Sequence, residues 1–196
     1  MTLFTTGEGN TPLTPDEQAD LIPNLATKEE LNQWERENIL IAYSWALNPR
    51  TLVRENALSE PYIRSLHQRM FDETWKWAGL YRTSEKNIGV PHHQIREQLA
   101  ILIGDTSYWI ENATFPPDEI AIRFHHRLVF IHPFANGNGR HARLMADILA
   151  KLQSRPEFTW GGADIVAQGE IRRGYIESLR AADKNDIGPL LAFARS

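Results

Sequence analysis

The sequence lacks cysteine, long apolar runs and any surplus of positive charge. The absence of cysteine excludes disulfide frameworks and thiolate metal sites. The chain has 21 Lys and Arg residues against 25 Asp and Glu residues, so its formal net charge is −4. This balance argues against general nucleic-acid binding, which depends on neutralising phosphates. Because the chain has no run of about 18 apolar residues and no signal-peptide pattern, we expect a cytoplasmic protein with no membrane contact and no direct nucleic-acid partner.

The length and composition predict one well-buried domain. The chain has 196 residues, of which 42% are hydrophobic, and it contains six tryptophans. Residues 1–26 are rich in Thr, Pro and Gly and show no sustained periodicity, so we expect an N-terminal arm there. Residues 27–196 are expected to form a single domain.

Helical spacing of apolar residues dominates from residue 27 onward. Thr27 and Glu30 fit a capping box at the start of the first helix. Ser59 opens the second helix, which we expect to end at Gly79. Further helices are predicted over residues 94–110, 117–132, 140–152, 170–181 and 189–194. Residues 80–93 contain turn residues without a helical period, so the expected class is all-α with one short β-hairpin.

A histidine stands where the fourth of these helices should end. Ala121, His125, Leu128 and His132 are spaced by four, three and four residues, so they share one helical face. We expect His125 to be an ordinary core histidine. Pro133 disfavours helical geometry at the residue before it, so His132 should end the helix and face a turn. A histidine in that position is free to meet a substrate.

The turn that follows combines features of an anion site. Gly137 and Gly139 let successive backbone N–H groups converge, and the unpaired N–H groups of the next helix point to the same place. Arg140 and Arg143 lie three residues apart on one helical face, where they can bind separate phosphate groups. The competing interpretation, an ion pair between Arg143 and Asp147, has the less favourable order along a helix. The Walker A and HExxH patterns are absent.

Two stretches of the chain resemble the motifs of a known family. The stretch HPFANGNGRHAR, residues 132–143, resembles HxFx(D/E)GNGRxxR, the signature of the Fic family, and WKWAGLYRT, residues 75–83, resembles its WAGxxRT motif. The run that includes NIGV, FHHRL and LRAADKNDIGPLLAFARS is similar to the Fic-type group called mobile mystery protein B. The resemblance implies a Fic-type helical bundle with a small β-hairpin flap.

The resemblance also implies an activity and residue roles. Fic proteins usually transfer AMP from ATP to a Ser, Thr or Tyr hydroxyl of a target protein, with the signature histidine, here His132, as the general base. Phe134 would be buried and would fix the loop. The phosphates would be held by a group of residues at the helix start, namely Gly137, Asn138, Gly139, Arg140 and Arg143. The target chain would be aligned by residues of the flap, which include Thr83, Asn87, Ile88 and Gly89.

One signature position departs from the pattern. Asn136 stands where the signature has Asp or Glu to hold Mg²⁺, and an amide is a neutral ligand. This leaves the role of Mg²⁺ open, and with it three alternatives to AMP transfer: another phosphate-containing donor, removal of AMP from a modified target, or a weakly catalytic nucleotide-binding module related to toxins. A helical protein without a nucleotide site is the remaining interpretation. The resemblance to mobile mystery protein B also implies a helix-turn-helix partner protein.

Many Fic proteins inhibit themselves with an (S/T)xxxE(G/N) segment whose glutamate pairs with the second signature arginine, here Arg143. Residues 51–56, TLVREN, match this pattern literally and contain Glu55, which we expect to be solvated. Glu8 precedes the core and is followed by glycine, but Phe4 occupies the Ser/Thr position. Our hypothesis is that Glu8 docks on Arg143 when ATP is absent, because a bidentate contact of this kind is a strong polar interaction.

Overall fold

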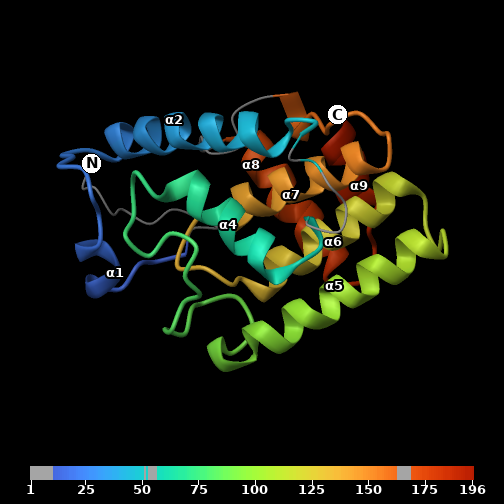
Figure 1. Ribbon diagram of the computed structural model, residues 1–196, viewed down its shortest axis with the longest axis horizontal. Coiled ribbons are helices and arrows are strands. Elements are labelled where there is room, and N and C mark those ends of the chain that lie inside the picture. Colours follow the sequence, from blue (N-terminus) through green and yellow to red (C-terminus); the bar gives the residue numbers. More distant parts are fainter. Residues whose placement is uncertain (1–10, 51, 53–56, 163–168) are drawn as a thin grey trace.

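The computed structural model describes residues 11–50, 52, 57–162 and 169–196, and all regular structure in these residues is helical (Figure 1). The all-α class is therefore confirmed. The helices are α1 (Pro15–Ala19), α2 (Lys28–Ala46), α4 (Glu60–Phe71), α5 (Ile95–Glu111), α6 (Pro117–Ile131), α7 (Asn138–Leu152), α8 (Glu170–Ala182) and α9 (Gly188–Arg195), with short 3₁₀ turns at His92–Gln94 and Trp160–Gly162. No helix in the described part of the chain is long and apolar enough to cross a membrane.

Side-chain caps fix the starts of the first long helices, as predicted. The Thr27 hydroxyl accepts the Glu30 N–H at 3.2 Å, and the Glu30 carboxylate accepts the Thr27 N–H at 3.0 Å. The Ser59 hydroxyl accepts the Tyr62 N–H at 3.3 Å at the start of α4. These bonds satisfy backbone donors that a helix start leaves without partners.

The predicted second helix is too long, because α4 ends at Phe71 rather than at Gly79. Trp75 and Trp77 are buried although they lie beyond the helix, and their rings stack with centroids 4.9 Å apart. The backbone around them pairs with the N-terminal segment instead, through a bridge between Leu21 and Trp75. Apolar residues at alternate positions fit this extended path as well as they fit a helix, so the periodicity alone was misleading.

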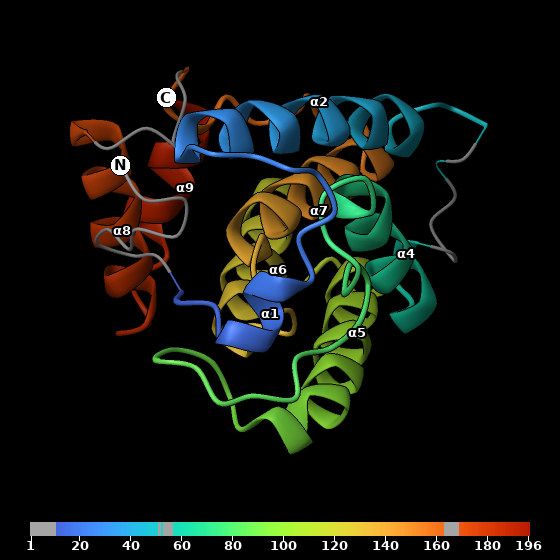
Figure 2. The ribbon, with the colours of Figure 1, turned by 90° about the vertical axis from the view of Figure 1, so that its left-hand side faces the viewer.

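The centre of the molecule is the antiparallel pair α6 and α7, which is the most extensive helix contact (Figure 2). Helix α5 packs along α6, α4 packs between α2 and α7, and α8 pairs with α9. The six residues that connect α6 to α7, His132 to Gly137, are almost entirely buried. The loop with the predicted site is therefore part of the core, and the helices on both sides of it fix its shape.

The described part of the predicted arm lies against the core. Thr14 and Glu17 form a capping box that starts α1, and the Glu17 carbonyl accepts the Trp77 indole N–H at 3.1 Å. Two backbone bonds, from Ile22 to the Thr74 carbonyl and from Lys76 to the Asp20 carbonyl, attach the next residues to the segment after α4. Residues 1–10 of the arm lie outside the described residues.

The predicted β-hairpin flap does not form. Residues 80–91 are all described and contain bends but no strand. Instead, the Arg82 guanidinium donates to the carbonyls of Ser84 and Val90 within the segment and to the carbonyl of His132. The backbone N–H groups of Arg82 and Val90 donate to the carbonyls of Pro133 and Ile131. The backbone N–H groups of the segment therefore bond to the end of α6, and the segment does not form a hairpin with its own backbone. A pattern of turn residues does not reveal such a partner.

Candidate active site

His132 caps the C-terminal end of α6 in a left-handed conformation, with φ 54° and ψ 59°. Its N–H still donates to the Leu128 carbonyl, so the helix ends at this residue, as Pro133 predicted. Non-glycine residues rarely adopt positive φ, and such residues concentrate at functional sites. Gly89 lies against this turn with φ +106°, and a Cβ atom there would be 2.7 Å from the His132 Cβ. Only glycine allows so close an approach.

The imidazole of His132 is 6% exposed and neutral at physiological pH. Burial is the main cause that lowers its pKa to about 4; the Val129 carbonyl opposes this shift, and the charges of Arg82 and Lys86 contribute to it. The Nε2 atom lies 2.9 Å from the hydroxyl oxygen of Thr11. In the tautomer with its proton on Nδ1, Nε2 accepts the hydroxyl proton, which is the contact that a general base needs.

The loop after His132 is held rigid from inside. The Asn138 amide accepts the Phe134 N–H at 2.9 Å and donates to the Phe134 carbonyl at 2.8 Å. Phe134 is fully buried and stacks on His67, with ring centroids 3.7 Å apart. His67 in turn bonds to the Asn136 carbonyl at 3.0 Å. The Asn138 side chain is therefore occupied by bonds within the loop. The group that Asn138 can still offer to a ligand is its backbone N–H at the start of α7.

Among the described residues, no side chain caps the start of α7. Gly137 precedes the helix with φ +78° and provides no side-chain cap, and a Cβ on Gly139 would meet nothing closer than 3.8 Å. Arg140 and Arg143 line one pocket of about 240 Å³ between α2 and α7. A helix start carries backbone N–H groups and a positive dipole end, and here two guanidinium groups of the first two turns of α7 line a pocket. This combination is typical of an anion site. Of the six predicted residues of this group, Arg140 and Arg143 line the pocket, whereas His132, Gly137, Asn138 and Gly139 are not part of its lining.

Glu35 is a site residue that the sequence analysis missed. Its carboxylate forms an ion pair with Arg140, at 2.6 Å from Nη1, and also accepts the Trp75 indole N–H at 2.8 Å. The Glu35 side chain is only 5% exposed. The available signal was its position four residues after Leu31 and seven before Ala42, on the face of α2 that is buried. A carboxylate on an apolar face usually requires a buried partner.

Among the described residues, no carboxylate pairs with Arg143. Its guanidinium lies over the Tyr175 ring at 5.4 Å, and the Tyr175 hydroxyl is 3.0 Å from Nε2 of the buried His125. Asp147 accepts N–H groups of Phe158 and Trp160 instead, so the ion pair between Arg143 and Asp147 does not form. Burial raises the pKa of Asp147 to about 7. Within the described part of the chain, the charge of Arg143 is therefore not compensated by a carboxylate.

Position 136 does not offer a suitable Mg²⁺ ligand. The Asn136 side-chain oxygen accepts the Gly137 N–H at 2.5 Å, and its carbonyl is bonded to His67. Protein-held Mg²⁺ usually has one or two carboxylate ligands, and Glu35, a carboxylate beside the site, is already paired with Arg140. The donor set of these residues therefore does not fit a protein-held Mg²⁺ ion.

The predicted flap residues have different positions. All four, Thr83, Asn87, Ile88 and Gly89, are exposed to solvent, and of them only Gly89 closely approaches His132 among the described contacts. Exposed side chains beside this loop can contact another chain. The predicted inhibitory residues Glu8 and Glu55 lie outside the described residues.

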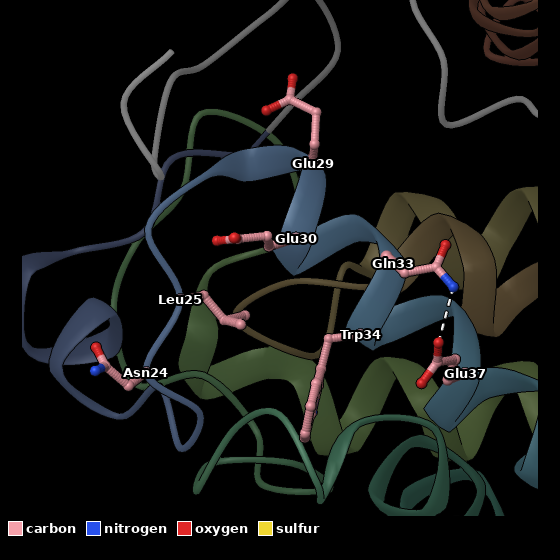
Figure 3. A pocket seen from close by; sticks show the side chains of 7 residues that line it. All are labelled: Asn24, Leu25, Glu29, Glu30, Gln33, Trp34 and Glu37. Atoms are coloured by element: carbon pink, nitrogen blue, oxygen red, sulfur yellow. Dashed lines mark hydrogen bonds between the residues drawn. The ribbon is translucent and has the colours of Figure 1, made fainter.

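A separate surface pocket of about 480 Å³ lies at the N-terminal half of α2 (Figure 3). Its lining includes three carboxylates, from Glu29, Glu30 and Glu37, and no basic side chain. Figure 3 shows Gln33 bonded to Glu37, and Trp34 pointing toward the segment below the helix. The negative charge of this pocket does not favour phosphate groups.

Comparisons with known proteins identify the family. Residues 57–150 match the Fic/DOC family. The protein adenylyltransferase Fic of Aedes aegypti is 30% identical over 148 residues, which cover 73% of this chain and 28% of that protein. A solved structure of Fic-1 from C. elegans is similar with a TM-score of 0.66 and 26% identity, over 91% of this chain and 51% of that chain.

A third similarity supports the fold alone. BepC of Bartonella tribocorum, solved with bound AMPPNP, has a TM-score of 0.65 at 18% identity and covers 93% of this chain and 97% of that chain. The chain spans less than a third of the length of the Aedes aegypti protein and about half of the C. elegans chain. The family match extends from the start of α4 through most of α7 and includes the whole loop from His132 to Gly137. With its signature loop at the junction of α6 and α7, the chain belongs to the Fic/DOC family.

Proposed function

We propose that the chain is a protein adenylyltransferase that transfers AMP from ATP to a hydroxyl side chain of a target protein. The observation that carries the proposal is a protein hydroxyl hydrogen-bonded to Nε2 of a buried, neutral histidine at the start of the loop that leads into α7. The Aedes aegypti and C. elegans relatives are named protein adenylyltransferases. A base, a hydroxyl and an anion site in one place are the groups that this reaction needs.

In the proposed reaction, His132 accepts the proton of the target hydroxyl as its oxygen attacks the α-phosphorus of ATP. The bond from the α-phosphorus to the bridging oxygen breaks, and pyrophosphate leaves with the electron pair. Gly137, Asn138 and Gly139 hold the α- and β-phosphates through backbone N–H groups, while Arg140 and Arg143 neutralise the β- and γ-phosphates. Catalysis then comes from positioning and from charge stabilisation.

The target chain would lie along the exposed residues of the segment after Arg82, namely Thr83, Asn87 and Ile88. Arg82 fixes this segment to the carbonyl of His132, so a chain bound there is held at a set distance from the base. Because the residues at position 136 do not fit a protein-held Mg²⁺ ion, we assign the ion no step. A helix-turn-helix partner protein and a cytoplasmic location remain part of the proposal.

Replacing His132 tests the proposal directly. His132→Ala removes the proton acceptor but leaves the N–H groups and arginines of the anion site, so the single-turnover rate of AMP transfer should fall by about 10²–10⁴-fold while ATP affinity is retained. His126→Ala is the matched control, because His126 lies on α6, the helix that His132 caps. Among the described residues, its ring forms a hydrogen bond with Asp183, which is remote in sequence from the loop after His132. An unchanged rate in His132→Ala would remove this residue from the mechanism.

A further inference from the structure

The N-terminal segment places one hydroxyl of the chain at the proposed base. Thr11 Oγ1 lies 2.9 Å from His132 Nε2, although the two residues are 121 positions apart in sequence. A hydrogen bond at this atom is the contact that the hydroxyl of a target would have to make. Thr11 is therefore placed as a substrate would be, rather than as a solvated residue of an arm.

A built set of contacts holds Thr11 in this place. The ammonium group of Lys86 donates to the carbonyl of Pro12 at 3.0 Å and pairs with Glu17 at 2.5 Å, and its side chain is only 2% exposed. The other oxygen of Glu17 accepts the Ser84 hydroxyl at 2.8 Å. Leu13 packs against the hydrophobic core. The segment that follows Thr11 is thus anchored to the same stretch, residues 82–90, along which a target chain would lie.

The interactions around Lys86 are strong enough to fix the register of the segment. A buried lysine with a carboxylate partner is costly to release, because its charge would be left without compensation. The helical cap at Thr14 adds a second constraint, since Glu17 accepts the Thr14 N–H at 2.8 Å while its own N–H donates to the Thr14 hydroxyl. Only two residues separate Thr11 from the cap residue Thr14, so the hydroxyl cannot move far from the base while the cap is intact.

We propose that Thr11 is a self-modification site, to which the chain transfers AMP from ATP within the same molecule. The inference rests on the proposed adenylyltransferase function. Thr11 Oγ1 attacks the α-phosphorus of ATP and gives its proton to His132 Nε2. The bond from the α-phosphorus to the bridging oxygen breaks, and pyrophosphate leaves with the electron pair. The products are Thr11 with a phosphodiester-linked AMP, pyrophosphate and one proton, which His132 releases to solvent.

Self-modification of Thr11 would compete with modification of other proteins. Only one hydroxyl can contact His132 Nε2 at a time, and Thr11 occupies this position. A chain whose residue 11 has no hydroxyl should therefore modify other proteins faster than the unmodified chain does, provided that the arm no longer blocks the base. The inference can therefore also be tested by comparing how fast the two chains transfer AMP to another protein.

The experiment incubates the full chain with ATP that is labelled at the α-phosphorus and locates the label by peptide mass spectrometry with fragmentation. The expected result is AMP on Thr11 in the unmodified chain and in Thr11→Ser, and its loss in Thr11→Val. Ser44→Ala is the matched control, because it removes an exposed hydroxyl that bonds only to the Leu40 carbonyl. Its labelling of Thr11 should be unchanged.

A mixing experiment tests whether the transfer is intramolecular. His132→Ala, which keeps Thr11 but lacks the base, is incubated with Thr11→Val, which keeps the base. No label should appear on Thr11 of the inactive chain, whereas label there would show transfer between molecules and overturn the intramolecular inference.

The outcomes separate this inference from the proposed function. Label on proteins of a lysate, or on other residues of this chain, without label on Thr11 overturns the inference and leaves the proposed function intact. Absence of AMP transfer to any protein by the unmodified chain and by Thr11→Val overturns both.

Discussion

Arg140 is paired with the carboxylate of Glu35, which should repel a phosphate group of ATP that binds the same guanidinium. The effect of replacing Glu35 on stability and on ATP affinity can be calculated. Glu35→Gln keeps the size and a hydrogen-bond acceptor but removes the charge that lies 2.6 Å from Arg140. Loss of one partner of a buried ion pair costs about 3–5 kcal/mol. Because Arg140 keeps 18% exposure and the amide can still accept its hydrogen bond, we expect a smaller loss of unfolding free energy, about 2 kcal/mol.

The same substitution should strengthen ATP binding. A carboxylate and a phosphate on one guanidinium lie roughly 6 Å apart, and at an effective dielectric constant of ~20 their repulsion is about 3 kcal/mol. Screening and the looser orientation of Arg140 reduce this gain, so we expect the dissociation constant of ATP to fall by about tenfold rather than by the full factor of about 100. ATP should consequently stabilise the variant more than it stabilises the unmodified protein.

Two measurements check this prediction. Urea unfolding without nucleotide gives the loss of stability, and calorimetric titration with ATP gives the affinity. Glu37→Gln is the matched control, because Glu37 lies on the same helix, is exposed and bonds to Gln33. If Glu35→Gln and Glu37→Gln bind ATP equally, Arg140 is not a phosphate ligand in competition with Glu35.

Three further predictions concern the loop and the core around it. Asn136→Asp should raise the Mg²⁺ dependence of transfer, because a carboxylate is the harder ligand; superimposable metal titrations of the two proteins would contradict this. Gly137→Ala should lower the melting temperature, because φ is +78° and the new Cβ would be 2.5 Å from the Phe71 ring, whereas Gly104→Ala, with open space around it, should not. Burial lowers the pKa of His141 to about 3, so the unfolded chain binds this proton first and stability is lost as the pH falls below about 6.5. The loss of unfolding free energy between pH 7 and 5 should therefore be about 2 kcal/mol smaller in His141→Gln, and equal losses would refute the assignment.

The local features of the site could be predicted from the sequence. The proline after His132 ends α6, Gly137 shapes the turn, and the spacing of Arg140 and Arg143 puts both in one pocket. Each of these features depends on residues within a few positions of one another. Backbone preference and helical spacing are therefore sufficient to predict them.

The contacts that complete the site could not be predicted in this way. Glu35 is 105 positions from Arg140, and Thr11 is 121 positions from His132, so only the packed fold brings them together. The absence of the predicted hairpin also results from a contact between residues far apart in sequence. Arg82 donates both to the carbonyl of Ser84 in its own segment and to the carbonyl of His132 at the end of α6. Turn residues predicted the irregular chain path correctly but could not show which backbone groups it would pair with.

The position of the transferred label tests the central claim most directly. The full chain is incubated with a cell lysate and with ATP that carries its label at either the α- or the γ-phosphorus. AMP transfer predicts labelled protein with the α-label alone, and His132→Ala should abolish this signal. Protein labelled by γ-labelled ATP would show phosphoryl transfer instead, and it would contradict the assignment of His132 and the α7 start to AMP transfer.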